Sequence, residues 1–174
     1  MAQDNEPIII DTLDKNFRDE IASEHGGEHI RRCFTCGTCT VTCPVFAVEE
    51  SYDPRKIIRM ILLGMREEVL TNDLIWLCSG CYSCQELCPR DVMITSVMTA
   101  ARNIAVRDGH IPSGIKGGVD QLDKYGRLLE VSEFENMTRA KKDVGELKET
   151  IPDVKKLLEK MGLFELVNGG DSND

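Results

Sequence analysis

The sequence predicts an all-α fold, and three observations support this prediction. Apolar residues recur three and four positions apart in several segments, as they do on one face of a helix. A cysteine phrase, C-x2-C-x2-C-x3-C-P, occurs twice, and no sustained alternation of apolar and polar residues flanks either copy. The two copies comprise Cys33, Cys36, Cys39, Cys43 and Pro44, and Cys78, Cys81, Cys84, Cys88 and Pro89.

Two helices are expected around the first copy of the phrase. Residues 14–22 form a short helix that leads toward it, with two apolar residues four apart on one face. After the phrase, Asp53 and Pro54 are typical of an N-cap and a first turn, and Gly64 is a suitable end. The apolar stripe between these signals consists of Ile57, Ile58, Ile61 and Leu62.

Three more helices are expected further along the chain. Thr71 or Asn72 caps a short helix that reaches Leu77 and delivers the chain to the second phrase. A longer helix follows Pro89 and stops at Gly109, and its stripe consists of Ile94, Met98, Ala101 and Ala105. A short amphipathic helix closed by Gly162 carries Val154, Leu157, Leu158 and Met161.

The remaining segments carry weaker signals. Residues 109–118 contain four glycines and are expected to be a loop or linker. Residues 122–150 are charged and weakly patterned, and residues 168–174 are expected to be disordered.

The spacing of the cysteines is the one by which [4Fe-4S] cubes are held on thiolates. Two intervening residues let a tight loop present three sulfurs to three corners of one cube. The fourth cysteine of each phrase, Cys43 or Cys88, is displaced and followed by a proline, so it suits the neighbouring cube. The predicted ligand sets are therefore Cys33, Cys36, Cys39 and Cys88 for one cluster, and Cys78, Cys81, Cys84 and Cys43 for the other. Two cubes use all eight cysteines and together contain about eight iron atoms and eight sulfide ions.

Two other uses of these cysteines explain the pattern less well. A disulfide framework needs an oxidising compartment, but residues 1–10 lack the basic region and apolar run of an export signal. Structural zinc bound by the C-x2-C pairs leaves two closely spaced cysteine pairs without a role. His25, His29 and His110 are interpreted as solvated or locally hydrogen-bonded residues, and no catalytic residue is predicted.

Several polar residues beside the cysteines have two possible roles. Backbone N–H groups at Gly37 and Gly80 are potential donors to cluster sulfurs, as are the hydroxyls of Thr35, Thr38, Ser79 and Ser83, although ordinary turn chemistry accounts equally well for the hydroxyls. Arg31, Arg32 and Arg90 either offset cluster charge, dock an acidic partner, or form a solvated face.

Composition limits the class of protein. The chain has 174 residues, 30 of them acidic and 21 basic, and the net charge of −9 argues against a nucleic-acid partner. The longest apolar candidate, residues 57–65, is interrupted by Arg59 and too short to span a membrane. We therefore expect a soluble protein of the reducing cytoplasm that binds other proteins.

The motifs resemble those of the heterodisulfide reductase C-subunit family, whose members are small dicluster proteins. The likeness is closest in the segments CFTCGTCT (33–40), WLC (76–78) and CYSCQELCPR (81–90). It extends from about residue 11 to residue 109, with a weaker echo at 162–166.

This resemblance implies an α-helical ferredoxin-like domain with two [4Fe-4S] clusters at residues 33–109. An N-terminal helical segment (1–32) precedes it, and a linker with a helical, partner-contacting extension and a disordered tail (110–174) follows. The implied function is one-electron relay from a flavin-containing subunit to a disulfide-reducing catalytic subunit, which in methanogens reduces the mixed disulfide of coenzymes M and B. Two alternatives remain open: a free-standing dicluster ferredoxin, and the equivalent relay subunit of a related sulfur-metabolism or electron-bifurcating complex.

Overall fold

The computed structural model describes residues 9–168, and within this range every regular element is a helix. The predicted all-α fold is therefore confirmed. The chain divides into two compact units, Met1–Ala105 and Val106–Asp174. The predicted boundaries after residues 32 and 109 remain a prediction.

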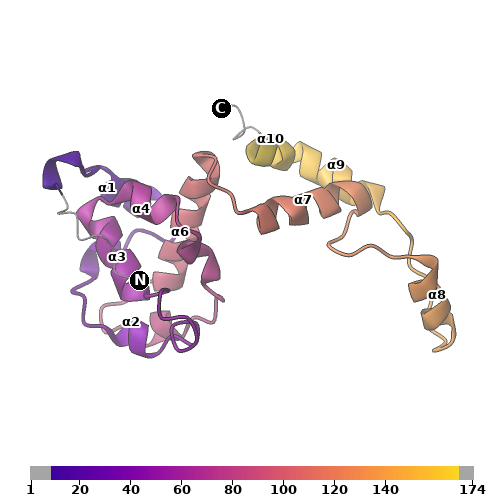
Figure 1. The fold of residues 1–174 in the computed structure, drawn as a ribbon, viewed down its shortest axis with the longest axis horizontal. Coiled ribbons are helices and arrows are strands. Elements are labelled where there is room, and N and C mark those ends of the chain that lie inside the picture. Colours follow the sequence, from indigo (N-terminus) through magenta and orange to yellow (C-terminus); the bar gives the residue numbers. More distant parts are fainter. Residues whose placement is uncertain (1–8, 169–174) are drawn as a thin grey trace. The chain divides into compact units, whose positions relative to one another are not determined.

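The first unit is a cluster of short helices around one longer helix (Figure 1). Helix α1 packs against α3, α3 packs against α4, and the short helices α2 and α5 pack against each other. The elements are η1 (Ile10–Thr12), α1 (Phe17–Ser23), η2 (Ile30–Arg32), α2 (Thr38–Val41), α3 (Pro54–Leu63), α4 (Arg66–Leu70), η3 (Asp73–Leu77), α5 (Ser83–Glu86) and α6 (Ile94–Arg107).

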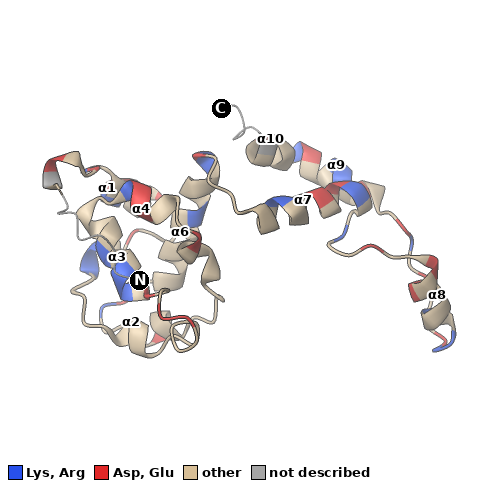
Figure 2. Ribbon diagram, viewed as in Figure 1, with Lys and Arg blue, Asp and Glu red and all other residues tan. Residues whose placement is uncertain are grey.

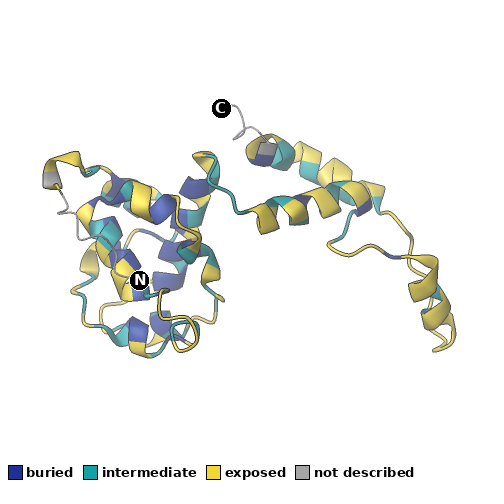
Figure 3. Ribbon diagram, in the orientation of Figure 1, coloured by how far each residue is buried: buried dark blue, intermediate teal, exposed yellow. Residues whose placement is uncertain are grey.

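The core of this unit lies between α1, α3 and α6, whose inward faces are dark blue in Figure 3. Some of its apolar side chains come from the stripes that the sequence predicts, and three cysteines belong to the same cluster. The largest buried members are Phe17, Ile21, Ile30, Tyr52, Ile57, Ile58, Ile61, Val69, Leu70, Ile75, Met98 and Ile104. The cysteine loops are thus built onto the core itself.

Helix α3 begins and ends as its sequence predicts. The Asp53 side chain accepts hydrogen bonds from the backbone N–H groups of Arg55 (2.9 Å) and Lys56 (3.2 Å). At the other end Gly64 has φ 84°, and a Cβ atom there would lie 2.3 Å from the carbonyl oxygen of Asp14. Glycine is required here because any side chain would collide with the N-terminal segment.

The helix expected before the second phrase is present as a 3-10 helix, η3. Of the two predicted caps, Asn72 is the one used, since its side chain accepts a hydrogen bond from Leu74 N (2.9 Å). The helix expected after Pro89 is confirmed as α6, and Gly109 follows it with φ 82°.

The second unit contains α7 (Ser113–Tyr125), α8 (Glu133–Ala140), α9 (Pro152–Lys160) and α10 (Leu163–Asn168). Helices α7, α9 and α10 pack together, and Lys155 on α9 forms an ion pair with Asp123 on α7 at 2.7 Å. The amphipathic helix predicted near residue 157 is confirmed as α9, and Gly162 follows it with φ 68°. The disorder predicted for 168–174 falls outside the described residues, except for Asn168, which ends α10.

The loop predicted at residues 109–118 is wrong over most of its length. Helix α7 begins at Ser113 and includes Gly114, Gly117 and Gly118. Each glycine costs a helix roughly 1 kcal/mol relative to alanine. Packing offsets this cost, because Val119 and Tyr125 on the same helix are buried.

Helix α8 and the segment after it are held together by hydrogen bonds of polar side chains. A capping box between Ser132 and Glu135 starts the helix. The Asn136 side chain donates to the carbonyl of Leu147 and accepts from its N–H group, both at 3.0 Å. No residue of α8 is buried.

Over the described part of the chain, none of the helices has the length and apolar character that crossing a bilayer requires.

Replacing Ile61 by alanine should strongly destabilise the first unit. Ile61 is 0 % exposed in the centre of α3, and such a truncation typically costs about 2–5 kcal/mol because a cavity remains. The apparent melting temperature, followed by far-ultraviolet circular dichroism of the anaerobic protein, should fall by roughly 10 °C or more. Leu63→Ala on the same helix is the control, since Leu63 is 50 % exposed. Equal losses in the two variants would contradict the assigned core.

Candidate metal centres

The two cysteine phrases adopt the same backbone conformation. Thr35 and Gly80 occupy equivalent positions and have φ of 60° and 65°. Gly37 and Tyr82 are also equivalent, with φ of 93° and 64°. Because a positive φ is unfavourable for residues other than glycine, Thr35 and Tyr82 are held there by their surroundings. After each loop a four-residue helix, α2 or α5, carries the chain to the fourth cysteine.

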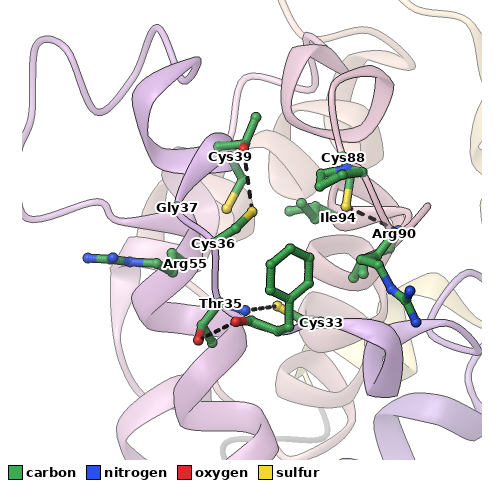
Figure 4. A pocket seen from close by; sticks show the side chains of 13 residues that line it. Cys33, Thr35, Cys36, Gly37, Cys39, Arg55, Cys88, Arg90 and Ile94 are labelled. Atoms are coloured by element: carbon green, nitrogen blue, oxygen red, sulfur yellow. Dashed lines mark hydrogen bonds between the residues drawn. The ribbon is translucent and has the colours of Figure 1, made fainter.

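Four cysteines surround one hollow, which we call site 1 (Figure 4). Three of them come from the first phrase, and the fourth, Cys88, comes from the second. The hollow encloses about 330 Å3 of empty space, including its open mouth. Its lining residues are Cys33, Phe34, Thr35, Cys36, Gly37, Thr38, Cys39, Arg55, Cys88, Pro89, Arg90, Val92 and Ile94.

The other four cysteines surround a second hollow, which we call site 2 and which encloses about 270 Å3 of empty space including its open mouth. Here three come from the second phrase, and Cys43 comes from the first. The lining residues are Cys43, Val45, Tyr52, Pro54, Cys78, Ser79, Cys81, Cys84 and Thr95. The structure therefore brings all eight predicted site residues together in two groups of four.

The partition between the sites is thin. Pro54 lines site 2 and its neighbour Arg55 lines site 1, both in the first turn of α3. Likewise Ile94 lines site 1 and Thr95 lines site 2, both in the first turn of α6. Two pairs of consecutive residues thus face the two sites.

The donor set suits a cluster better than a single ion. Within residues 9–168 no group of three histidine, cysteine, aspartate or glutamate side chains is close enough to hold one metal ion. In a [4Fe-4S] cube each sulfur ligand binds a different iron atom, so the four sulfurs need not meet at one point. Four thiols around a hollow are consistent with that geometry.

Burial disfavours free thiolates at the inner cysteines. It raises the pKa of Cys39 to about 11, and it also raises the pKa values of Cys33 and Cys84. Thiolate ligands at these positions therefore depend on a positively charged iron centre to offset the desolvation of the sulfur.

The exposed cysteine of each loop has a lowered pKa, in contrast to the buried cysteines. Hydrogen bonding to Thr38, chiefly through its hydroxyl, lowers the pKa of Cys36. The backbone N–H of Ser83, followed by its hydroxyl, lowers the pKa of Cys81. The two hydroxyl oxygens lie 3.4 and 3.6 Å from the respective sulfurs.

The predicted sulfur contacts are partly confirmed. Thr38 and Ser83 lie beside cysteine sulfurs, and the Ser79 hydroxyl also lowers the pKa of Cys81. For the Thr35 hydroxyl the other expected role, ordinary turn chemistry, is the one observed, because that group donates to the carbonyl of Phe34 at 2.8 Å. It is the backbone N–H of Thr35 that donates to Cys33 Sγ, at 3.4 Å.

Sequence reasoning missed two buried hydroxyls at site 2. Tyr52 is 2 % exposed, and burial, together with a hydrogen bond to Cys78, raises the pKa of its hydroxyl. Thr95 is also buried, and its Oγ1 lies 3.7 Å from Cys84 Sγ. Neither residue belongs to a motif, and both reach the site through tertiary packing.

Arg102 was also missed as a supporting residue. From α6 its Nε donates to the carbonyl of Ile75 at 2.9 Å, and its Nη2 donates to the carbonyl of Cys78 at 3.0 Å. The guanidinium also lies over the Trp76 ring, 5.7 Å from the centroid. Arg102 therefore fixes the end of η3 where the second loop begins.

Comparison with known proteins identifies the family. A profile described as "4Fe-4S dicluster domain" matches residues 29–92, which include all eight cysteines. The chain is 33 % identical over 162 residues to the C-subunit of the H(2):CoB-CoM heterodisulfide,ferredoxin reductase of Methanothermobacter thermautotrophicus, with 89 % of this chain and 86 % of the relative covered. The chain belongs to the heterodisulfide reductase C-subunit family.

Two other relatives agree with this assignment. The iron-sulfur C-subunit numbered 2 of the CoB–CoM heterodisulfide reductase of Methanocaldococcus jannaschii is 36 % identical over 129 residues, which cover 70 % of this chain and 68 % of the relative. A protein of Archaeoglobus profundus that is named as similar to the heterodisulfide reductase C-subunit is 33 % identical over 157 residues, which cover 84 % and 81 %. As a member of this family, the chain carries two [4Fe-4S] clusters and is an iron–sulfur electron-transfer subunit.

Changing Tyr52 to phenylalanine should lower the midpoint potential of one cluster only. The Tyr52 hydroxyl lies beside Cys78, and a hydrogen bond to a cluster sulfur favours the reduced state. Loss of a bond of about 1 kcal/mol corresponds to roughly 40 mV for one electron. A redox titration followed by electron paramagnetic resonance measures both clusters. Tyr82→Phe is the matched control, because Tyr82 is 52 % exposed and does not line either hollow. An equal shift of both clusters would argue against a local hydrogen bond.

Proposed function

We propose that this chain is the relay subunit of a heterodisulfide reductase-type complex. In this proposal it passes single electrons from a flavin-containing subunit to a disulfide-reducing catalytic subunit in the cytoplasm. The observation that carries the proposal is the arrangement of all eight cysteines around two adjoining hollows within one small unit. The names of the relatives support the kind of complex, since they refer to the C-subunit of CoB–CoM heterodisulfide reductases.

The proposed ligand sets cross between the two phrases. Cys88 completes the first set with Cys33, Cys36 and Cys39, and Cys43 completes the second with Cys78, Cys81 and Cys84. The composition of sites 1 and 2 supports this assignment, because each hollow is lined by three cysteines of one phrase and the fourth cysteine of the other.

As a relay, the protein has to hold the two clusters close together and shield them from water. When bound, each cluster supplies a centre that accepts and releases one electron. Val92 and Ile94 are buried at site 1, and Tyr52 and Thr95 are buried at site 2, so these residues exclude water from the inner walls. The thin partition at Pro54–Arg55 and Ile94–Thr95 keeps the two centres close. Transfer between them requires no bond to form or break.

The alternatives are a free-standing dicluster ferredoxin and the equivalent relay subunit of a sulfur-metabolism or electron-bifurcating complex. The second unit favours a subunit over a free carrier, because its helices α8 and α9 bury none of their own residues and a carrier needs no such extension. Size-exclusion chromatography of the native protein separates these possibilities. A stable assembly is expected for a subunit, and a monomer of about 19.5 kDa for a carrier.

If the ligand sets cross between the two phrases, cysteine variants from different phrases should damage the same cluster. Cys88→Ser should perturb the same electron paramagnetic resonance signal as Cys36→Ser, because both residues line site 1. Cys43→Ser should perturb the other signal, together with Cys81→Ser. If Cys88→Ser instead paired with Cys81→Ser, each phrase would hold its own cluster and the assignment would be wrong.

The isolated chain should store electrons without reducing a disulfide. All eight thiolates are assigned to clusters, so no cysteine remains for disulfide chemistry. After reduction by a strong artificial donor, absorbance bleaching should persist when a disulfide substrate is added, and should reverse only when the catalytic subunit is present. In the assembled complex, Cys84→Ser should interrupt this transfer, and subunit association should be less affected if docking relies on the C-terminal half. Substantial turnover by the purified chain alone would refute the relay function.

A further inference from the structure

Six basic residues lie in, or next in sequence to, the segments that line site 1. They come from three separate segments: the turn before the first loop, the first two turns of α3 and the residue after Pro89. All six are exposed, and blue marks the first turns of α3 in Figure 2. We call them the basic rim: Arg31, Arg32, Arg55, Lys56, Arg59 and Arg90.

The rim borders directly on the cluster site. Arg55 and Arg90 both line the hollow and lie on opposite sides of it in Figure 4. Arg55 also lines an adjoining surface depression, together with Thr35, Lys56, Arg59 and one acidic residue, Asp53. Arg55 and Arg90 therefore flank the hollow of site 1, and Lys56 and Arg59 extend the positive charge over the adjoining depression.

Most of this charge is not neutralised within the protein. Arg31 is hydrogen-bonded to Asp19, and Arg55 lies 3.9 Å from a carboxylate oxygen of Asp53. In the part of the chain that the structure describes, Arg32, Lys56, Arg59 and Arg90 form no ion pair. Such a concentration is unexpected in a chain of net charge −9.

The basic rim is not explained by a need to balance the negative charge of the cluster and its thiolates. If cationic side chains were needed to balance a cluster with four thiolates, both sites would need them. The described residues that line site 2 include no lysine or arginine. Basic residues at site 1 alone therefore indicate a binding partner that approaches site 1 and not site 2.

An exposed apolar side chain, Phe34, lies beside the basic rim. Phe34 lines site 1 and is 59 % exposed. Protein interfaces commonly place an aromatic residue at their centre and charged residues around it. An exposed cysteine, Cys36, lies in the same hollow, so a bound partner approaches one edge of the cluster closely.

We propose that the basic rim docks an acidic redox protein, a subunit or carrier whose one-electron centre is ringed by carboxylates. Complementary charge steers such a partner to site 1 and sets its orientation. Site 1 is then the port through which the relay exchanges electrons with that partner. This inference rests on the relay function proposed above and specifies the surface and charge of one partner.

The test measures electron transfer between the full-length, cluster-loaded chain and a purified acidic bacterial ferredoxin by stopped-flow spectroscopy. At low salt, Lys56→Glu/Arg59→Glu should slow the second-order rate constant roughly tenfold or more, since steering of this kind is worth at least that factor. Added salt should slow the wild-type reaction by a similar factor and have little effect on the variant. Arg32→Glu, from a different segment, should show a smaller change of the same kind.

The matched control is Lys141→Glu/Lys142→Glu in the second unit, which changes the net charge equally and also alters exposed residues. Equal slowing in this control would mean that net charge, not the rim, governs the encounter, and would overturn the proposal. So would a rim variant that shifts a cluster potential but keeps the wild-type salt dependence, because the rim would then compensate cluster charge. Salt-sensitive binding to anionic phospholipid vesicles, with ferredoxin kinetics unchanged by the rim variant, would also overturn it.

This assay contains no flavin subunit and no disulfide-reducing subunit. A loss of disulfide turnover in the assembled complex, or a failure to assemble it, therefore tests the proposed function without affecting the result for the rim.

Discussion

Iron–thiolate bonding is the interaction on which the cysteine loops of the first unit depend. The loops that carry the cysteines have little stability of their own, because α2 and α5 are four residues long and helices of that length do not persist without tertiary support. Thr35 and Tyr82 adopt a left-handed backbone, and the inner thiols are buried. Each of these features costs free energy, and bonds between iron and the thiolates offset it. Helix packing alone accounts for α1, α3, α4 and α6.

The two sites are alike in their loops and different in their walls. The repeated phrase produces matching backbone turns and matching hydroxyl contacts at Cys36 and Cys81. Outside the loops the symmetry ends, because site 1 is bordered by exposed arginines and site 2 by buried hydroxyl groups. Such a difference suits the proposed relay, in which the two centres face different partners and need not share one potential.

Local patterns in the sequence predicted the grouping of the cysteines and the ends of several helices. The cysteine spacing, the Asp53 cap and the stop at Gly64 depend only on neighbours along the chain, so they are legible without a structure. Tyr52, Thr95 and Arg102 act across long stretches of sequence, and no periodicity marks them. Helix α7 was missed for a related reason. Its glycines lower helix propensity, and the packing of Val119 and Tyr125 that overcomes them is tertiary.

The partition between the sites is made of main chain as much as of side chains. Consecutive residues at 54–55 and 94–95 face opposite hollows, and neighbouring Cα atoms are held about 3.8 Å apart by covalent geometry. Side-chain repacking or thermal motion changes such a spacing very little. The two sites therefore share their walls, and a shift of α3 or α6 moves both of them together. In the proposed relay the gaps that can vary most are those between this protein and its partners, which places the control of electron flow at the encounter with a partner.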